Sequence, residues 1–231
     1  MARHAPTQIG EYMNPLASAT SQPRALLVLE DGTTFEGRCC GASGETFGEI
    51  VFNTSMTGYQ EIISDPSYAG QIVTLTYPQV GNYGIDPAVM QRDVLHLRGF
   101  VVHDMCYEPS NWTSKQSLPE FLQENGVVAI EGIDTRALTM HLRDHGAQKA
   151  GISTEDLDPA HLLARVQASP NISEHNFVPD VSVDAPHVVP ATSKKRFNVV
   201  AYDCGEKNGI LQGLAANGCE VTVVPWNTPA E

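Results

Sequence analysis

Short apolar runs separated by turns rich in Gly, Pro and Asn dominate the first 130 residues of the chain. The run at 25–29 is followed by Asp31-Gly32, after which strand-like residues resume at Thr33. An Asp-Gly pair between two such runs predicts a hairpin with a type I′ turn, because that turn needs positive φ, where glycine is least costly. β-Branched and aromatic residues predict further strands at 49–53, 71–77, 99–105 and 127–130. This part of the chain is therefore predicted to be mainly β.

Helical periodicity begins only after these strands. Three helices are predicted where a capping residue precedes an apolar stripe, namely Ser117 before 118–125, Asp134 before 135–145 and Asp158 before 159–168. The residues that follow, up to 196, are rich in Pro, Val and Asp and show no period. Such composition is typical of a linker, which we place at 173–196.

The pattern changes again after this linker. An unbroken apolar strand at 197–202 is followed by a glycine-containing loop, a helix at 210–217 and a second apolar strand at 219–224. Strand, helix and strand in this order predict the start of a parallel α/β sheet. The segment from 197 to 231 holds only 35 residues, and segments under about 40 residues rarely fold alone. We therefore expect that the chain is a fragment or that another chain completes this sheet.

Composition narrows the class of protein. Among 231 residues, 14 Lys+Arg stand against 27 Asp+Glu, which gives a formal charge of −13. This acidic excess argues against nucleic acid as a partner, and no apolar run approaches the ~20 residues that span a bilayer. Five cysteines without a C-x-x-C pair indicate neither a disulfide framework nor a zinc site. A cytoplasmic protein is predicted, with a flexible N-terminal extension at 1–23 that contains no signal-peptide core.

Two groups of residues resemble catalytic or metal-binding arrangements. His141 and His145 lie at i, i+4 on one helix face, a spacing used for metal ligation, but no third ligand is evident. We prefer surface or capping histidines and predict no metal site. Cys204 follows a strand and precedes a helix, as nucleophiles on strained elbows do, yet the G-x-C-x-G form and a base are missing. We therefore interpret Cys204 as a structural thiol and the adjacent pair Cys39-Cys40 as packing residues.

The loop at 203–209 joins the strand to the helix and contains neither G-x-G-x-x-G nor G-x-x-x-x-G-K-[ST]. A plain βα loop is the preferred interpretation. The most unusual stretch is 52–61, together with Asp65-Pro-Ser-Tyr, where hydroxyl and amide groups are dense. Such groups are costly to bury unless they are hydrogen-bonded. They indicate either a hydrogen-bonded loop network or a surface that binds a polar zwitterion or a partner, and the spacing does not decide between the two.

Several of these motifs resemble one family. The segments at 25–32, 52–61, 65–68 and 72–78 together look like the small subunit of glutamine-hydrolysing carbamoyl-phosphate synthetase, and 132–139 and 199–207 match the same family. The resemblance runs from about residue 24 to 231. It implies a mixed, β-rich α/β fold: a β/β/α N-terminal domain at 24–172, and an incomplete flavodoxin-like βαβ segment of a class I glutamine amidotransferase at 197–231.

The resemblance also implies a function. In the family, a cysteine assisted by His and Glu attacks the side-chain amide of glutamine through a thioester. The released ammonia passes to a large subunit, which uses bicarbonate, ATP and Mg to make carbamoyl phosphate for arginine and pyrimidine biosynthesis. The implied partners are therefore L-glutamine and the large subunit of a cytoplasmic heterodimer, and no cofactor is expected in this chain.

The family's catalytic residues are expected beyond residue 231, so no catalytic residue is assigned here and the chain itself is predicted to be inactive as a glutaminase. Cys204 does not match the nucleophile position. The one substrate contact that the resemblance carries over is Ser67 of the Asp-Pro-Ser-Tyr motif, as a glutamine-binding residue. Two alternatives stay open, a non-enzymatic N-terminal module that docks the large subunit and a small-molecule sensor built around Ser67.

Overall fold

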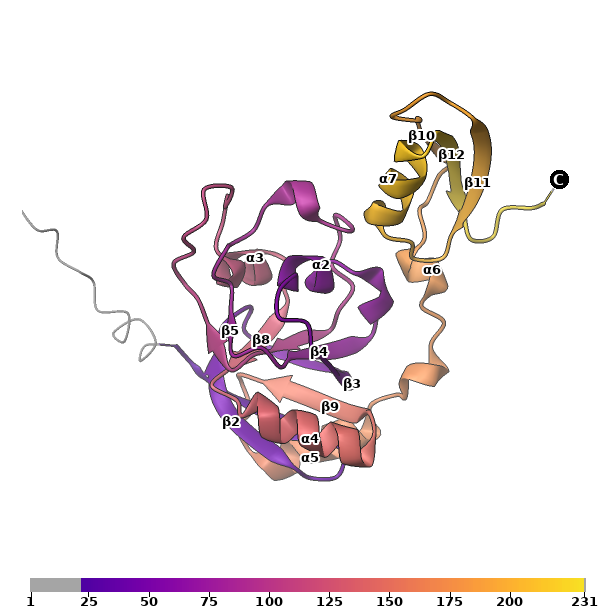
Figure 1. Ribbon diagram of the computed structural model, residues 1–231. Helices are drawn as coiled ribbons and strands as arrows, with labels where there is room; N and C mark the ends of the chain where they lie inside the picture. Colours follow the sequence, from indigo (N-terminus) through magenta and orange to yellow (C-terminus); the bar gives the residue numbers. More distant parts are fainter. Residues whose placement is uncertain (1–21, 231) are drawn as a thin grey trace, which may run out of the picture.

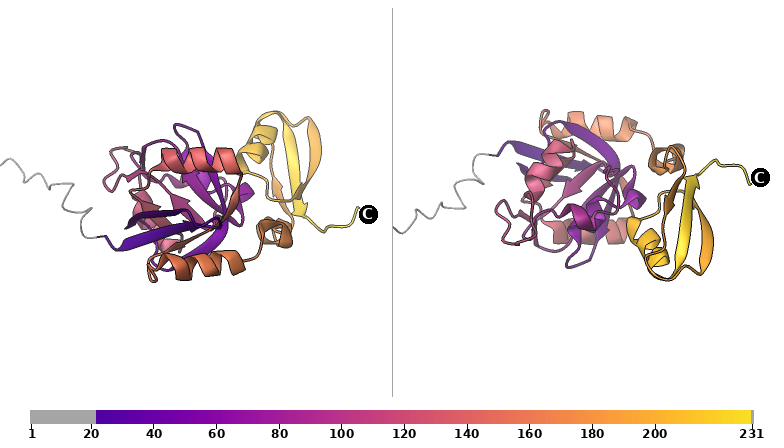
Figure 2. Two further views of the ribbon diagram at one scale, coloured as in Figure 1. Left: turned by 90° about the horizontal axis from the view of Figure 1, so that it is seen from below. Right: turned by 90° about the horizontal axis from the view of Figure 1, so that it is seen from above.

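The computed structural model describes residues 22–230, so the extension predicted at 1–23 lies outside the described residues except for its last two positions. The described chain forms a strand barrel and a smaller sheet close to its C-terminal end (Figure 1). Two further views show the small sheet beside the barrel, with helices packed around the barrel (Figure 2). This arrangement confirms the predicted mixed α/β chain.

The barrel closes through strands that are far apart in sequence. Its strand order is β1-β2-β8-β6-β4-β3-β9, and β9 pairs with β1 to complete the circle. The β3–β4, β4–β6 and β6–β8 pairs are parallel and the others are antiparallel. The strands are β1 (Arg24–Leu29), β2 (Thr34–Cys39), β3 (Glu45–Asn53), β4 (Gln71–Leu75), β6 (Gly99–Val101), β8 (Val128–Glu131) and β9 (Gln148–Ser153).

The predicted hairpin of β1 and β2 is present, but the predicted type I′ turn is wrong. That turn needs positive φ at both central residues, whereas among residues 22–230 only glycines have positive φ, Gly32 with 90° among them. Leu29 N donates to Thr33 O and Gly32 N donates to Leu29 O, both at 2.9 Å. This is the three-residue loop in which a type I turn ends in a glycine of positive φ, so Asp31 keeps an ordinary conformation.

The three predicted helices are confirmed. Ser117 and Glu120 form a capping box at the first, and the carboxylates of Asp134 and Asp158 accept backbone N–H groups at the other two. Every helix among residues 22–230 is too short or too polar to cross a membrane. The helices are α3 (Leu118–Glu124), α4 (Thr135–His145) and α5 (Pro159–Ala168).

Helix α2 (Tyr59–Ile63), strand β9 and the two-residue strand β5 (Gln79–Val80) are not predicted by the pattern of the first part. Helix α2 has only five residues and follows Gly58, whose φ is 86°, so it shows no helical period. Strand β9 begins with Gln148 and Lys149 and lacks the apolar run of its neighbours. The single strand predicted at 99–105 is divided into two strands, β6 and β7 (Asp104–Met105). Strand β7 pairs in parallel with β5, and these two form a separate small sheet.

Alternate side chains of the barrel strands enter different parts of the core. Leu27 packs in a cluster that includes Leu138 of α4, whereas its neighbour Leu26 packs against Leu162 of α5. Phe100 of β6 is completely buried in a third cluster, which reaches α2 and α3. The period of two along β1 therefore assigns each face of the strand to a different helix.

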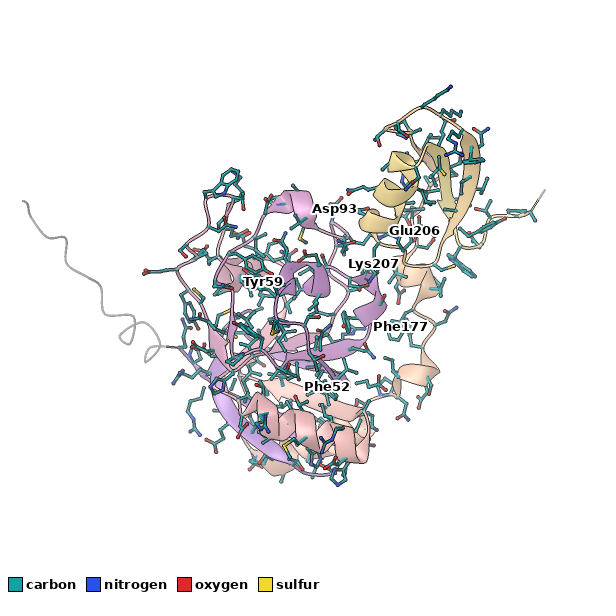
Figure 3. All side chains as sticks on the ribbon, viewed as in Figure 1. Phe52, Tyr59, Asp93, Phe177, Glu206 and Lys207 are labelled. Atoms are coloured by element: carbon teal, nitrogen blue, oxygen red, sulfur yellow. The ribbon has the colours of Figure 1, made fainter. Side chains whose placement is uncertain are left out.

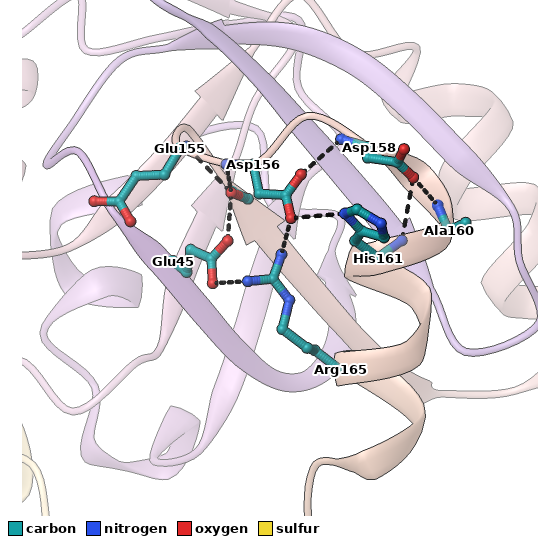
Figure 4. A network of polar contacts seen from close by, with 8 residues as sticks. Glu45, Glu155, Asp156, Asp158, Ala160, His161 and Arg165 are labelled. Carbon is teal, nitrogen blue, oxygen red and sulfur yellow. Dashed lines mark hydrogen bonds and ion pairs between the residues drawn. The ribbon is translucent and has the colours of Figure 1, made fainter.

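Helix α5 is also held by charged side chains. Arg165 bridges two carboxylates, Glu45 of β3 at 2.7 Å and Asp156 before the helix at 3.1 Å (Figure 4). At the other end, Nζ of the buried Lys149 donates to the carbonyl of Gln167 at 2.8 Å. A cation at these free carbonyls stabilises the C-terminal end of a helix.

The smaller sheet has the order β10-β12-β11. Strands β11 and β12 are parallel and are connected by a helix, as the sequence predicts, while β10 is antiparallel to β12. Leu211 of the helix packs on Val221 and Val223 of β12, so one face of the sheet is covered. The elements are β10 (His187–Val189), β11 (Phe197–Asp203), α7 (Asn208–Ala216) and β12 (Cys219–Pro225).

The stretch predicted as an irregular linker, 173–196, contains regular structure. It includes α6 (Val178–Val181) and β10, and β10 adds an edge strand to the smaller sheet. Elements of three or four residues are too short to show a period, which is why the sequence did not reveal them. The domain limits at 24–172 and 197–231 stay a prediction.

Candidate functional site

Ser67 lies on the surface where α2 ends and a short 3-10 helix, η1 (Pro66–Tyr68), begins. Asp65 caps this helix, because its Oδ1 accepts the N–H of Ser67 at 2.9 Å. On the other side of the turn, the amide of Asn53 donates to the hydroxyl oxygen of Tyr68 at 2.9 Å. The turn is therefore fixed by side chains of the barrel while Ser67 itself stays exposed.

A cavity of about 350 Å³ opens beside this turn. One wall comes from the barrel and the other from Lys207, which belongs to the loop between β11 and α7 (Figure 3). Lys207 Nζ and Asp65 Oδ2 are 2.7 Å apart. A volume of this size is typical of small-molecule sites, and groups of both charges with neutral amides suit a zwitterion. The lining residues are Asn53, Glu61, Ile62, Asp65, Tyr68, Gln91 and Lys207.

Burial opposes ionisation of Asp65, but the Lys207 ammonium and the N–H of Ser67 outweigh it and lower the pKa of this carboxyl. We expect Lys207→Met to raise the pKa of Asp65, because the ammonium is removed and the burial is kept. Carbon-13 NMR titration of the Asp65 carboxyl measures this change. Lys195→Met is the matched control, since Lys195 forms a similar pair with Glu220 on the smaller sheet, at 2.6 Å.

The sign of the pH dependence follows from the lowered pKa of Asp65. Its contacts stabilise the folded chain fully above the unfolded-state pKa of about 3.9. That contribution is lost as the pH falls through the lower folded-state pKa. In Lys207→Met the folded-state pKa lies closer to the unfolded-state pKa, so the contribution is smaller and its loss is complete at a higher pH. An unchanged titration of Asp65 would contradict this account.

Asp203 organises the loop that carries Lys207. Its carboxylate is completely buried, and its Oδ1 lies 2.5 Å from Arg92 Nη2 of the barrel. The same oxygen accepts the N–H groups of Gly205 and Glu206, and Oδ2 accepts the N–H of Val183 at 2.8 Å. Burial raises the pKa of Asp203, but Arg92 and the two N–H groups of the loop outweigh it and lower the pKa. Two N–H groups of the loop are thus occupied by the chain's own carboxylate, which supports the interpretation as a plain βα loop.

The dense polar stretch at 52–61 is in part a hydrogen-bonded network. Gln60 is completely buried and exchanges two hydrogen bonds with the backbone of Asp86. The hydroxyl of Tyr59 donates to the carbonyl of Gly84 at 2.7 Å. Asn53 instead lines the cavity beside Ser67. The network interpretation is confirmed for Tyr59 and Gln60, and a binding role is left for the residues that face the cavity.

The cavity beside Ser67 is lined by none of the cysteines or paired histidines. Cys39 and Cys40 are buried, as the packing interpretation expects, and Cys204 is exposed. Within the described part of the chain, the hydrogen bonds of the cysteines run to backbone carbonyls and none runs to a histidine. His141 Nε2 lies 2.6 Å from Asp31 Oδ2, and His145 Nδ1 lies 3.0 Å from the carbonyl oxygen of His141. Both histidines therefore have partners within the chain.

The prediction of Ser67 rests only on the family resemblance, and no sequence pattern predicted Lys207, Arg92 and Asp203 as neighbours of this turn. Lys207 meets a residue 142 positions earlier, and Arg92 meets one 111 positions later. A charged residue in a short loop after an apolar strand was the available signal. The loop motif Asp-Cys-Gly-Glu-Lys carries three such residues.

Comparison with known proteins gives a consistent result. A family model described as "Carbamoyl-phosphate synthase small chain, CPSase domain" matches residues 27–152. A protein named carbamoyl phosphate synthase small chain from Syntrophotalea carbinolica is 48% identical over 220 residues, which cover 90% of this chain and 58% of the relative. Proteins of the same name from Thermosynechococcus vestitus and Thermotoga maritima are each 48% identical and cover 90% and 88% of this chain. The chain spans 58% and 52% of the lengths of these two relatives.

Proposed function

The chain belongs to the carbamoyl-phosphate synthase small-chain family, and we propose that it contributes the barrel and first βαβ unit of a small subunit that hydrolyses glutamine. The ammonia is supplied to a large subunit, which makes carbamoyl phosphate from bicarbonate with ATP and Mg. The single observation that carries the binding part of this proposal is the exposed Ser67 turn beside a cavity with charges of both signs.

The geometry supports glutamine as the ligand in a specific way. A free amino acid carries an ammonium and a carboxylate, and Asp65, Glu61 and Lys207 offer the complementary charges around one cavity. Ser67 presents a hydroxyl, which both donates and accepts hydrogen bonds, so it can contact either end of the ligand. We assign Ser67 a binding role and no catalytic one.

The nucleophile is not assigned to any cysteine of this chain. Cys39, Cys40 and Cys219 are buried, and neither Cys106 nor Cys204 is hydrogen-bonded to a histidine among residues 22–230. Activated thiols need a base or a nearby positive group. We therefore propose that β11, α7 and β12 begin a flavodoxin-like amidotransferase unit, and that the 231 residues alone do not release ammonia from glutamine.

Ser67→Ala is expected to raise the KM for glutamine about 3–10-fold, because one hydrogen bond to the ligand is lost. The rate of carbamoyl phosphate synthesis from added ammonia is expected to stay unchanged. The assay uses a small chain of the relatives' full length that carries these residues, assembled with its large chain. Ser173→Ala is the matched control, because Ser173 is also exposed and also lies in a 3-10 helix, η3 (Ile172–Glu174). An unchanged KM would remove Ser67 from the glutamine site.

A docking module without glutamine binding is the second candidate. It is favoured by two large apolar side chains that are exposed on the barrel part, Met56 at 76% and Trp112 at 92%, because aromatic residues and methionine are enriched at protein interfaces. This alternative predicts that the chain co-purifies with a large subunit and that Ser67→Ala changes nothing. The glutamine KM of the same variant therefore separates the two candidates.

A further inference from the structure

Gln91, in the barrel part, caps a helix of the smaller sheet. The first N–H of α7, that of Asn208, donates to the carbonyl of Gln91 at 3.1 Å, and the next, that of Gly209, donates to Gln91 Oε1 at 3.2 Å. The helix has no side-chain cap of its own, since Lys207 occupies the N-cap position. Gln91 in turn donates its N–H to the hydroxyl of Ser64 at 3.0 Å.

Arg92 holds the start of the same loop. It donates through Nη2 to Asp203 and through Nε to the carbonyl of Glu206 at 2.8 Å. Glu206 and Asn208 are the two chain neighbours of Lys207. The backbone on each side of Lys207 is thus tied to consecutive residues of the barrel part, Gln91 and Arg92.

The loop also approaches the Ser67 turn closely. Gly205 has a φ of 96°, and a Cβ at this position would lie 2.8 Å from Val181 Cγ2 and 3.6 Å from Pro66 Cβ. Glycine is required here by the positive φ and by the close approach to Val181, whereas Pro66, the residue that precedes Ser67, lies at ordinary van der Waals distance. The loop is therefore placed against the turn by packing as well as by hydrogen bonds.

These contacts form a closed circuit. From Ser64 it runs through Gln91 to the N-terminus of α7, then to Lys207, and from Lys207 Nζ to Asp65, the residue next to Ser64. The other oxygen of the Asp65 carboxylate, Oδ1, accepts the hydrogen bond from the N–H of Ser67. In such a closed network of hydrogen bonds each side chain is held in one orientation, because it cannot rotate without breaking a bond to its neighbour.

We propose that Gln91 and Arg92 are positioning residues for the glutamine contact: they fix Lys207, which orients Asp65 and through it Ser67. The inference rests on the proposed function of Ser67. It adds that the orientation of the smaller sheet against the barrel sets the affinity for glutamine. In this proposal Arg92 acts only through the loop that carries Lys207, by its bonds to Asp203 and Glu206.

Amide hydrogen exchange of the chain tests the circuit without any activity. In Arg92→Ala, the amides of Ser67 and Gly209 are expected to exchange about tenfold faster, while that of Ile50 in the barrel core stays unchanged. Arg92→Lys is expected to restore part of the protection, since it keeps a charge beside Asp203. Arg24→Ala, which removes an exposed arginine of β1, is the matched control and should change none of these rates.

Gln91→Ala is a second variant for the case in which Arg92→Ala does not fold. It removes only the hydrogen bond from Gly209 N–H to the Gln91 side chain. It should speed exchange at Ser67 and Gly209 in the same way, by a smaller factor. Unchanged exchange at Ser67 in both variants would overturn the proposal, even where the smaller sheet has loosened.

The kinetic test uses the full-length small chain assembled with its large chain. Arg92→Ala is expected to raise the KM for glutamine at least threefold, with the turnover number and the ammonia-dependent rate nearly unchanged. An unchanged KM overturns the positioning role. A wild-type assembly that does not use glutamine defeats the proposed function instead, and the exchange experiment still decides whether the circuit exists.

Discussion

Asp203→Ala is expected to detach the smaller sheet from the barrel, at a cost of about 3–5 kcal/mol to the local stability of that sheet. The carboxylate is completely buried and accepts hydrogen bonds from Arg92 and from the N–H groups of Val183, Gly205 and Glu206. Alanine leaves all four donors without this acceptor, and a charge that has lost its partner is the costliest of them. Native-state hydrogen exchange of the β12 amides measures the loss.

Two further variants locate the cause. Asp203→Asn keeps the size and one acceptor oxygen but loses the charge, so its effect should fall between wild type and Asp203→Ala. Asp144→Ala removes a carboxylate that is 54% exposed beside Arg143, and surface substitutions of this kind usually change stability by less than about 0.5 kcal/mol. If β12 exchanges at the wild-type rate in Asp203→Ala, the carboxylate does not hold the two parts together.

Local signals made several elements predictable. Ser117, Asp134 and Asp158 each cap a helix within three residues of themselves, so the sequence near each residue contains the whole interaction. Strands β11 and β12 were recognisable for a related reason, because both are apolar runs separated by a helical segment. Interactions within a few residues leave a pattern that can be counted.

Distant pairing left no such pattern. The barrel closes only when β9 pairs with both β1 and β3, and β9 contains a buried lysine that a periodicity argument assigns to the surface. That lysine is stabilised by two carbonyls at the C-terminal end of α5, those of Gln167 and of the C-cap residue Ser169. The tertiary partner thus outweighed the polarity of Lys149 itself, and no neighbour in sequence indicates it.

The candidate site shows the same division. The prediction of Ser67 came from a motif of four adjacent residues, and two of them, Asp65 and Tyr68, line the cavity beside the turn. The circuit that positions it depends on Arg92 and Lys207, whose partners are more than a hundred positions away. The loop at 203–209 lacks a phosphate motif, as a plain βα loop does. Its carboxylate, Asp203, also accepts a hydrogen bond from Arg92, which the loop's own sequence does not indicate.

Phe100→Ala is expected to destabilise the barrel by about 3–5 kcal/mol, the usual cost of truncating a buried phenylalanine. Phe100 is completely buried at the centre of β6, between its pairing partners Val73 of β4 and Ala129 of β8. Urea unfolding, monitored through hydrogen exchange of the β4 and β8 amides, measures the change in the free energy of unfolding. Phe197→Ala removes the same side chain where it is 52% exposed, and should cost less than about 0.5 kcal/mol.

Together, Phe100→Ala and Asp203→Ala test the predicted domain limits. Two units that unfold separately would let Asp203→Ala speed exchange in β12 alone, with β4 and β8 protected as in wild type. Phe100→Ala would then speed hydrogen exchange of the barrel amides. Exchange in β12 would rise only to the extent that β12 is stabilised by the barrel through Arg92 and Gln91. Equal acceleration of all strands in both variants would show one cooperative unit, and the limits at 24–172 and 197–231 would be wrong. Because the smaller sheet has a single covering helix and one uncovered face, we expect β12 to depend on the barrel far more than the barrel depends on β12.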